Sequence, residues 1–201
     1  MKEMRKKISL ILLLLISCGA GCRIVWMNYR YPSPEVWTGG LHESLQAGNY
    51  VITFSDWQWG DGSLLQELCP GFCLITVEDE TEKGTFREYP ADRERVGLVT
   101  LRIEKTEEDG SILDLTGIAF ESGAWGNQFD MELMHLLNPR LEGLRIQMEK
   151  GECREIIFPM TMLDLQFGER AWEGIDRRDF YVVLEYYPEK LQFRCGQETS
   201  F

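Results

Sequence analysis

Histidine is scarce in this sequence, which contains two, His42 and His135, among 201 residues. An imidazole titrates near neutral pH and is the commonest general acid or base in enzymes. Neither histidine is flanked by a recognisable catalytic signature, and the Gly-x-Ser-x-Gly sequence of α/β-hydrolases is absent. We therefore expect no catalytic residue and predict that the protein is not an enzyme, with a small cell-envelope hydrolase as the alternative.

Sequence patterns for metal or cofactor sites are missing as well. A structural zinc site needs four ligands, and the two histidines and six cysteines show no standard ligand spacing. Asp56 and Asp61 lie in a segment that superficially resembles a calcium loop, but its oxygen ligands do not fall at the required positions. We therefore expect neither a metal site nor a cofactor.

The cysteines do not form a redox motif. Cys69 and Cys73 are separated by three residues, one more than in a thioredoxin-type motif. Cys153 opens one expected strand and Cys195 follows the last one, so a disulfide between them would pin the C-terminus of a domain outside the cytoplasm. The bond between Cys153 and Cys195 is one disulfide candidate of this sequence, and a bond between Cys69 and Cys73 would close a tight local loop.

Basic residues are few outside the N-terminus. The whole chain has a formal net charge of −12, whereas residues 31–201 hold 15 basic and 32 acidic side chains, a net charge of −17. An anionic domain is repelled by the phosphates of nucleic acids and by anionic lipid headgroups. This composition argues against nucleic acid as a partner and suits solubility beside a negatively charged surface.

One long apolar run is present, and it follows a basic segment at the N-terminus. Four basic residues fall within 1–7, and residues 8–16 are apolar apart from Ser9. This order is typical of a secretory signal or signal anchor, with the basic end in the cytoplasm. We therefore expect a protein of the cell membrane whose remaining residues lie on the extracytoplasmic face.

The apolar run has two alternative fates. Residues 15–18, Leu-Ile-Ser-Cys, resemble the lipobox of bacterial lipoproteins, in which Cys18 would be lipidated and would begin the mature chain. Alternatively, residues 8–27 remain as an uncleaved anchor, because about twenty apolar residues span a bilayer and Arg23 can snorkel to the outer interface. Both alternatives tether the protein to the membrane.

Composition divides the chain into three segments. Residues 1–27 form the signal, lipoprotein or signal-anchor segment. Residues 28–48 contain two prolines and three glycines with little periodicity and are predicted to be a linker or lead-in. Residues 49–201 are predicted to form one β-rich extracytoplasmic domain, of an ordinary size for a single domain.

Alternation of apolar and polar residues recurs through the third segment and predicts strands. The expected strands cover residues 50–59, 72–77, 99–103, 144–148, 156–162 and 180–184. Asp109-Gly110 is a strong hairpin signal, so residues 112–120 are expected to pair with the strand before it. Residues 180–184 are apolar on both faces, which is typical of a central strand.

Short helices interrupt the strands. Asp130 can cap the first, which would end before Pro139, and apolar residues at helical spacing over 167–175 predict the second. Short strands with turns between them favour a mainly β fold. We expect an antiparallel, immunoglobulin-like sandwich with one or two short helices, preceded by the N-terminal hydrophobic anchor.

Tryptophan supplies the candidates for ligand binding. Trp57 and Trp59 would project from the same face of a strand, and Trp125 lies between small residues. Exposed tryptophan can stack on sugars or dock peptides. The alternative is that these three side chains fill the sandwich core or close its ends.

The C-terminal third carries a distinctive series of short motifs, namely Leu133-Met134, Asn138-Pro139, Leu141-Glu142-Gly143, Gly151-Glu152, Phe158-Pro159, Trp172 and residues 181–190. This series resembles domain-of-unknown-function family five-zero-two-eight, a family of small membrane-anchored proteins of Gram-positive gut anaerobes. The resemblance implies an extracytoplasmic, sandwich-like domain without known activity, an N-terminus that remains as an uncleaved anchor, and no catalytic residues.

The patterns agree on one interpretation of function. We expect a membrane-tethered extracytoplasmic binding or accessory module that is not an enzyme. Its partners would be the membrane, through the anchor, and a protein or cell-envelope ligand, without nucleic acid.

Overall fold

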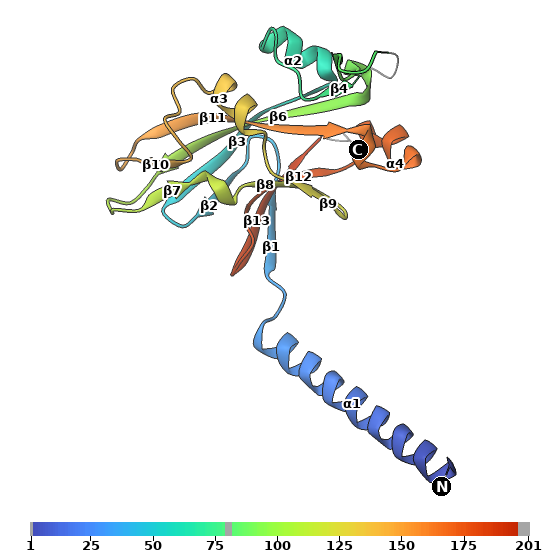
Figure 1. The fold of residues 1–201 in the computed structure, drawn as a ribbon. Coiled ribbons are helices and arrows are strands. Elements are labelled where there is room, and N and C mark those ends of the chain that lie inside the picture. Colours follow the sequence, from blue (N-terminus) through green and yellow to red (C-terminus); the bar gives the residue numbers. More distant parts are fainter. Residues whose placement is uncertain (1, 79–81, 197–201) are drawn as a thin grey trace. The chain divides into compact units, whose positions relative to one another are not determined.

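The computed structural model describes residues 2–78 and 82–196, and the chain divides into two compact units, Met1–Glu35 and Val36–Phe201. The first unit is the helix α1 (Lys2–Arg30). The second unit consists mainly of antiparallel strands with a few short helices (Figure 1). The mainly β fold predicted from the sequence is therefore confirmed.

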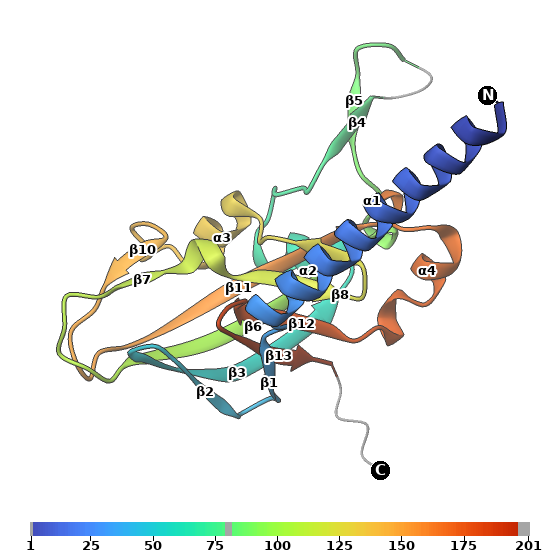
Figure 2. The same cartoon turned by 90° about the horizontal axis from the view of Figure 1, so that it is seen from below.

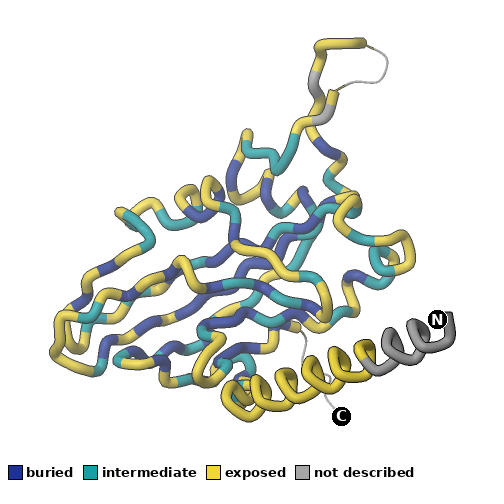
Figure 3. The backbone as a smooth tube through the Cα atoms, turned by 60° about the horizontal axis from the view of Figure 1, so that its bottom comes forward, coloured by how far each residue is buried: buried dark blue, intermediate teal, exposed yellow. Residues whose placement is uncertain are grey.

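Helix α1 is long because residues 2–30 contain no proline and are rich in leucine and isoleucine, which a helix accommodates well. It ends shortly before Pro32 and Pro34, which disfavour continuation of the helix. The side chains of residues 12–30 are exposed (Figure 3). The apolar segment Leu12–Arg30 has a mean hydropathy of 1.4 and is long enough to cross a membrane.

Two mainly antiparallel sheets form the sandwich. The first contains, in spatial order, β1 (Glu35–Gly39), β13 (Glu189–Cys195), β12 (Phe180–Glu185), β8 (Ala119–Ser122) and β9 (Trp125–Asn127). The second contains β11 (Cys153–Leu163), β6 (Glu94–Lys105), β3 (Tyr50–Gly60) and β2 (Ser44–Ala47). The chain crosses between the sheets from β1 to β2, from β6 to β8, from β9 to β11 and from β11 to β12, and the two layers confirm the predicted sandwich.

The core lies between the two sheets, where alternate residues of each strand meet. Phe54 of β3 and Phe193 of β13 belong to opposite sheets, and their ring centroids are 5.7 Å apart. A β-bulge between Phe54 and Asp56 changes the alternation, so Trp57 and Trp59 point to the same inner face as Phe54. The bulge therefore brings both tryptophans to the end of the core.

Short helices cover the outer face of the second sheet. Val96 and Leu98 of β6 point away from the main core and pack with Leu65 of α2 (Gly62–Leu68) and Leu133 of α3 (Met131–Leu137). The side chain of Asp130 accepts a hydrogen bond from Leu133 N at 2.8 Å, as expected for an N-cap. α3 and α4 (Glu169–Glu173) confirm the two expected helices, whereas α2 is an additional one.

Several short elements connect the strands. They are the strands β4 (Thr76–Glu78), β5 (Phe86–Glu88), β7 (Ile112–Asp114) and β10 (Arg145–Gln147), and the 3₁₀ helices η1 (Ala91–Arg93), η2 (Leu115–Gly117), η3 (Asp164–Gln166) and η4 (Ile175–Arg177). Figure 2 shows the β4–β5 hairpin projecting from the sandwich. Of the strand expected at residues 72–77, only residues 76 and 77 belong to a strand, β4.

The expected pairing after Asp109-Gly110 is wrong. Residues 112–114 form β7, which pairs with β10, and residues 119–122 form β8, which pairs with β12. Both edges of β6 are already occupied, one by β3 and the other by β11. A hairpin with the following residues is therefore excluded by strands that are distant in the sequence.

The lead-in expected at residues 28–48 also needs correction. Residues 35–39 and 44–47 form β1 and β2, and the second compact unit begins at Val36 rather than at residue 49. β1 lies beside β13, where Gln192 Nε2 donates to Thr38 Oγ1 at 3.0 Å (Figure 1). A strand this short is stabilised by its distant partner, so its own sequence shows little periodicity.

Candidate functional site

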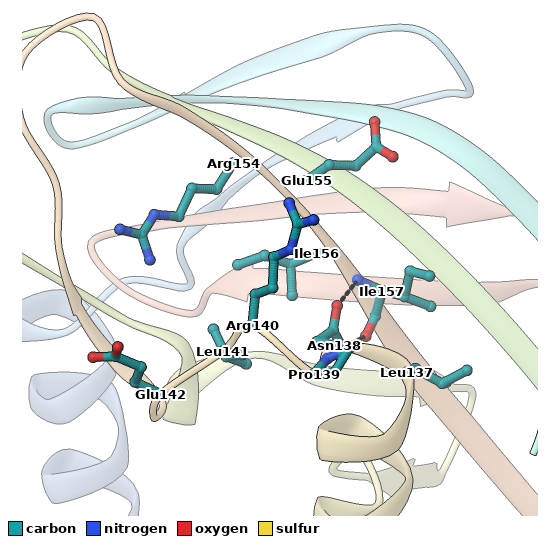
Figure 4. Close-up of a pocket in the computed structure, with 10 residues that line it drawn as sticks. All are labelled: Leu137, Asn138, Pro139, Arg140, Leu141, Glu142, Arg154, Glu155, Ile156 and Ile157. Carbon is teal, nitrogen blue, oxygen red and sulfur yellow. Dashed lines mark hydrogen bonds between the residues drawn. The ribbon is translucent and has the colours of Figure 1, made fainter.

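The main candidate site is a groove between the residues that follow α3 and the edge strand β11 (Figure 4). Its volume is about 630 Å³, within the range of small-molecule and peptide sites. The groove is lined by residues of two segments, Leu137, Asn138, Pro139, Arg140, Leu141 and Glu142, and Arg154, Glu155, Ile156 and Ile157. Below, "the groove" means this set.

Asn138 determines how the two walls of the groove are joined. Its Nδ2 donates to the carbonyl oxygen of Ile157 at 2.8 Å, and its Oδ1 accepts from Ile157 N at 2.9 Å (Figure 4). Nδ2 also donates to the carbonyl of Met134 in the last turn of α3 at 2.8 Å. The side-chain amide therefore replaces a neighbouring strand at Ile157 and ties the end of α3 to β11.

The backbone of β11 continues along the groove as a free edge. β11 pairs with β6 on one side only, since it is the terminal strand of its sheet. In an antiparallel pair, alternate residues direct their N–H and C=O groups away from the partner strand. The N–H and C=O groups of Ile157 point away from β6, toward Asn138. Glu155 lies two residues earlier on β11, so its N–H and C=O groups point to the same free edge. An extended ligand could pair with these groups.

Charged side chains surround an apolar floor in the groove. Figure 4 shows the Arg140 side chain extending toward β11, whereas Glu142 points away from that strand. Arg154 Nε lies 2.7 Å from Glu152 Oε1, which helps to hold the pKa of Glu152 below its usual range, after the backbone hydrogen bond from Glu149. Leu141 and the buried Ile156 provide apolar surface. The combination suits a ligand with carboxylate and peptide groups.

The three tryptophans predicted as a ligand patch come together in one aromatic cluster. Trp57 stacks on Trp59 with ring centroids 5.7 Å apart, and Trp59 lies 5.1 Å from Phe180. Trp125 lies 6.0 Å from Phe180 in an edge-on arrangement. The ring of Phe167 lies between two tryptophans, and its centroid is 5.7 Å from that of Trp125 and 5.9 Å from that of Trp172.

The indole N–H of Trp59 is engaged within the protein. Trp59 Nε1 donates to Asp176 Oδ1 at 3.0 Å, and Arg95 Nε donates to the same oxygen at 2.8 Å. The Arg95 hydrogen bond is the main reason why the pKa of Asp176 lies below its usual value. Arg95 also lies over the ring of Trp172, 5.4 Å from its centroid. These contacts favour the alternative in which the tryptophans close the end of the sandwich.

The cysteines are free thiols throughout the described chain, so the disulfide expected between Cys153 and Cys195 is not present. Cys153 is exposed on β11, and Arg102 Nε donates to its Sγ at 3.0 Å. Cys195 is fully buried on β13, and this burial raises the pKa of its thiol to about 12. The two residues lie in different sheets, a separation that sequence spacing could not reveal. Cys18, the lipidation candidate, is exposed on α1.

Neither histidine lies in the groove. His42 is exposed in a turn with φ 65°, and His135 is exposed on α3. Within residues 2–78 and 82–196, no group of three or more histidine, cysteine or carboxylate side chains could hold a metal ion. The groove residues themselves were not singled out as a site by the sequence, where Asn138-Pro139 marked only the end of a helix and one motif of the family resemblance.

Comparison with protein families gives one match. The model of a family described as "Domain of unknown function (DUF5028)" matches residues 77–191, which is more than half of the chain. The match covers both walls of the groove and omits β1, β2 and β3. No curated protein matches the chain.

Comparison with solved structures gives matches of low sequence identity. A conserved hypothetical protein from Bacillus anthracis is 12% identical, with a TM-score of 0.45 over 76% of this chain and 93% of that one. A protein from Bacillus subtilis, named provisionally as a lipoprotein, is 10% identical, with a TM-score of 0.43 over 78% and 39%. An uncharacterised β-sandwich protein from Clostridium difficile is 10% identical, with a TM-score of 0.41 over 80% and 95%.

Proposed function

The chain belongs to the family described as "Domain of unknown function (DUF5028)", and we propose that it is a non-enzymatic binding or accessory module of the cell envelope. In this proposal α1 tethers the protein to the cell membrane, and the sandwich lies on the extracytoplasmic face. The groove beside β11 is the ligand site of the module.

The exposure of α1 is the observation that carries this proposal. The segment Leu12–Arg30 is apolar, with a mean hydropathy of 1.4, and its side chains are exposed. Exposed leucine and isoleucine side chains in water cost free energy, about 25 cal/mol for each Å² of apolar surface. A helix of this length and composition is stable when lipid covers it, which makes a membrane the natural surroundings of α1.

The residues at the two ends of α1 favour one orientation. Residues 2–7 include four basic side chains, which remain on the cytoplasmic side of a membrane. The other end carries Trp26, Tyr29 and Tyr31, which are all exposed. Tryptophan and tyrosine accumulate at the boundary between lipid and water. In this orientation everything after Tyr31 lies outside the cell, and the anchor is retained rather than cleaved before Cys18.

The chemistry of the groove supports binding rather than catalysis. Its charged groups are two arginines and two glutamates, and both histidines lie outside it. The carboxyl group with a pKa raised to about 7, Glu94, is buried beside α2 and not in the groove. A catalytic site brings a nucleophile, a base and a group that orients the base into contact, and the groove lacks such a set among its lining residues.

Labelling of Cys153 in intact cells tests the tether and the location of the domain. Cys153 is exposed, whereas Cys195 is fully buried. We expect a membrane-impermeant maleimide to label the full chain in intact cells, and Cys153→Ser to remove most of this label. Cys195→Ser is the control and should keep it. The labelled protein should sediment with membranes at the mass of the uncleaved chain.

Two results would contradict this part of the proposal. Label that enters Cys153 only after lysis would place the domain in the cytoplasm. Full-length protein in the soluble fraction would exclude the tether. A chain that begins at a lipidated Cys18 would retain the tether but overturn the uncleaved anchor.

Titration with soluble peptide-bearing cell-wall fragments tests the groove. Such fragments offer the carboxylate and peptide groups that Arg140 and the edge of β11 can bind. We expect saturable amide shifts at Asn138, Arg140, Glu155 and Ile157 in nuclear magnetic resonance spectra of the chain in detergent micelles. Arg140→Glu should weaken binding about tenfold, the loss of about 1.4 kcal/mol.

The matched control for this titration is Arg170→Glu, which reverses the charge of an exposed arginine on α4 outside the groove. It should leave the affinity unchanged. Shifts confined to the aromatic cluster around Trp59 would move the ligand site to that end of the sandwich and contradict the groove.

A further inference from the structure

Large apolar side chains are exposed at one end of the first sheet. Val36 and Trp37 of β1 are 53% and 48% exposed. Tyr186 and Tyr187, in the turn between β12 and β13, are 45% and 64% exposed. Exposed apolar groups are ordinary when scattered, but a gathering of them marks a surface that is covered in the working protein. These four residues are called the tether-proximal surface below.

Two contacts place all four residues at the same end of the sheet. Thr38 of β1 is hydrogen-bonded to Gln192 of β13, and a Cβ on Gly39 would lie 2.8 Å from the ring of Phe193. Successive residues of β1 therefore lie beside successive residues of β13, so the two strands run in the same direction. The start of β1 is beside the start of β13, and Tyr186 and Tyr187 immediately precede that start.

The chain between the two units is too short to let this end move far from the membrane. Five residues separate Arg30, the last residue of α1, from Val36. Even when this linker is fully extended, the six steps from Arg30 to Val36 span at most roughly 22 Å. Pro32 and Pro34 restrict this linker further. If α1 spans the bilayer, the start of β1 is held within about that distance of the headgroups.

We propose that the tether-proximal surface docks on the outer lipid interface, with Trp37 and Tyr187 inserted among the headgroups. This inference rests on the proposed function, because it requires α1 to be in the membrane. Amphipathic aromatic rings are favoured at that boundary, where one part of the ring contacts acyl chains and the other contacts water. Trp26, Tyr29 and Tyr31 at the end of α1 are exposed aromatic side chains of the same kind.

The charge of the domain favours neutral rather than anionic lipid as the occupant. Residues 31–201 carry a net charge of −17, which opposes approach to an anionic surface. Tyr186 is held beside Lys190, whose Nζ lies 5.5 Å from the ring centroid, and Lys190 in turn pairs with Glu121. This lysine beside the surface is thus already paired with a carboxylate. Docking therefore depends on aromatic insertion, not on phosphate binding.

Fluorescence quenching by brominated lipid tests this docking. The full chain is reconstituted into vesicles of phosphatidylcholine with bromine atoms on the upper part of the acyl chains. We expect Trp37→Phe to remove a clear share of the quenchable tryptophan emission. The control is Trp125→Phe, on the opposite edge strand β9, which should remove emission that the lipid does not quench. Trp26 is present in all of these proteins.

The outcomes separate the docking from the tether. If the full chain does not float with the vesicles, the tether fails and the docking fails with it. If the chain floats but Trp37→Phe and Trp125→Phe lose equal quenchable emission, the tether stands and the docking is overturned. Tyr187→Ser gives a second measurement, because loss of this insertion should reduce quenching of Trp37 while the chain still floats and its melting temperature is unchanged.

Discussion

Among single residues, Glu94 is the carboxyl group whose surroundings oppose its charge most strongly. Its residue is 4% exposed, at the start of β6 against the first turn of α2. Burial is the main cause that raises its pKa from the usual value near 4.5 to about 7, and the nearby carboxylates Glu88 and Asp61 add to it. Folding therefore favours the protonated form of Glu94.

Lys105 is buried as deeply as Glu94, but its ammonium group has an ion-pair partner and hydrogen-bond acceptors. It is 1% exposed, and its ammonium group lies 3.1 Å from Asp109 Oδ1. Nζ also donates to the carbonyl oxygens of Asp109 and Ser111 at 3.0 and 3.1 Å. Asp109, hydrogen-bonded by Ser111 and Lys105, has its pKa lowered to about 2. Burial alone does not determine how much a charged group destabilises the fold, because hydrogen-bond partners can compensate for the hydration that the group loses.

The Glu94 environment predicts that the domain becomes less stable as the pH rises. The folded state binds the Glu94 proton more tightly than the unfolded state, so its stabilising effect is complete below pH 4.5 and is lost as the pH rises through about 7. We expect this group to lower the free energy of unfolding by about 2–3 kcal/mol between pH 4.5 and pH 8. Urea denaturation at several pH values measures it.

Glu94→Gln provides the control for this pH dependence, because an amide of the same shape does not titrate. The variant should lose much less stability than the wild type over the same pH range. An equal loss in both proteins would assign the pH dependence to other groups. Glu152→Gln, just before the start of β11, should leave the wild-type profile in this range unchanged, since the pKa of Glu152 is lowered.

At the scale of secondary-structure elements, β3 and β6 pack through a close contact between a large and a small residue. Gly97 of β6 is paired with Trp59 of β3. A Cβ at Gly97 would lie 2.4 Å from Trp57 Cη2 and 2.8 Å from Met160 Cε. Both distances are shorter than van der Waals contact, so the indole ring occupies the space that a side chain would fill.

We expect Gly97→Ala to displace the Trp57 ring and to destabilise the protein by about 1–3 kcal/mol, as overpacking does in other cores. Near-ultraviolet circular dichroism should change with it, because Trp57 stacks on Trp59. Gly110→Ala is the matched control, since nothing lies within 4 Å of a Cβ there. That variant should stay within about 0.5 kcal/mol of the wild type. Equal melting temperatures for both variants would show that the space beside Gly97 can accommodate a methyl group.

Strands and helices were predicted correctly where the local sequence itself shows an alternation or a helix-end signal. Residues 156–162 and 180–184 are recognisable as strands because alternate positions face different surroundings. α3 is recognisable because Asp130 caps it and Pro139 follows its end. α2 has the same length and was missed, although Asp61 caps it and Pro70 follows shortly after its end.

At the scale of the whole molecule, charge and apolar surface are separated along the chain. The N-terminal helix carries basic residues and exposed apolar side chains, whereas residues 31–201 carry the net charge of −17. The family match covers residues 77–191, but the sandwich also needs β1, β2 and β3, since β3 is a central strand of the second sheet. The compact unit is therefore larger than the segment that the family model recognises.

The sequence by itself determined the features that depend on local composition and period, namely the apolar N-terminal helix, the antiparallel β domain and two of its short helices. The tertiary structure alone decided which strands pair, that Cys153 and Cys195 remain apart, and that Trp57, Trp59 and Trp125 meet in one cluster. It also decided the groove, where the Asn138 side chain joins the end of α3 to β11. The physical reason is that periodicity records which side of a strand is buried, whereas edges, cavities and contacts depend on residues far away in the chain.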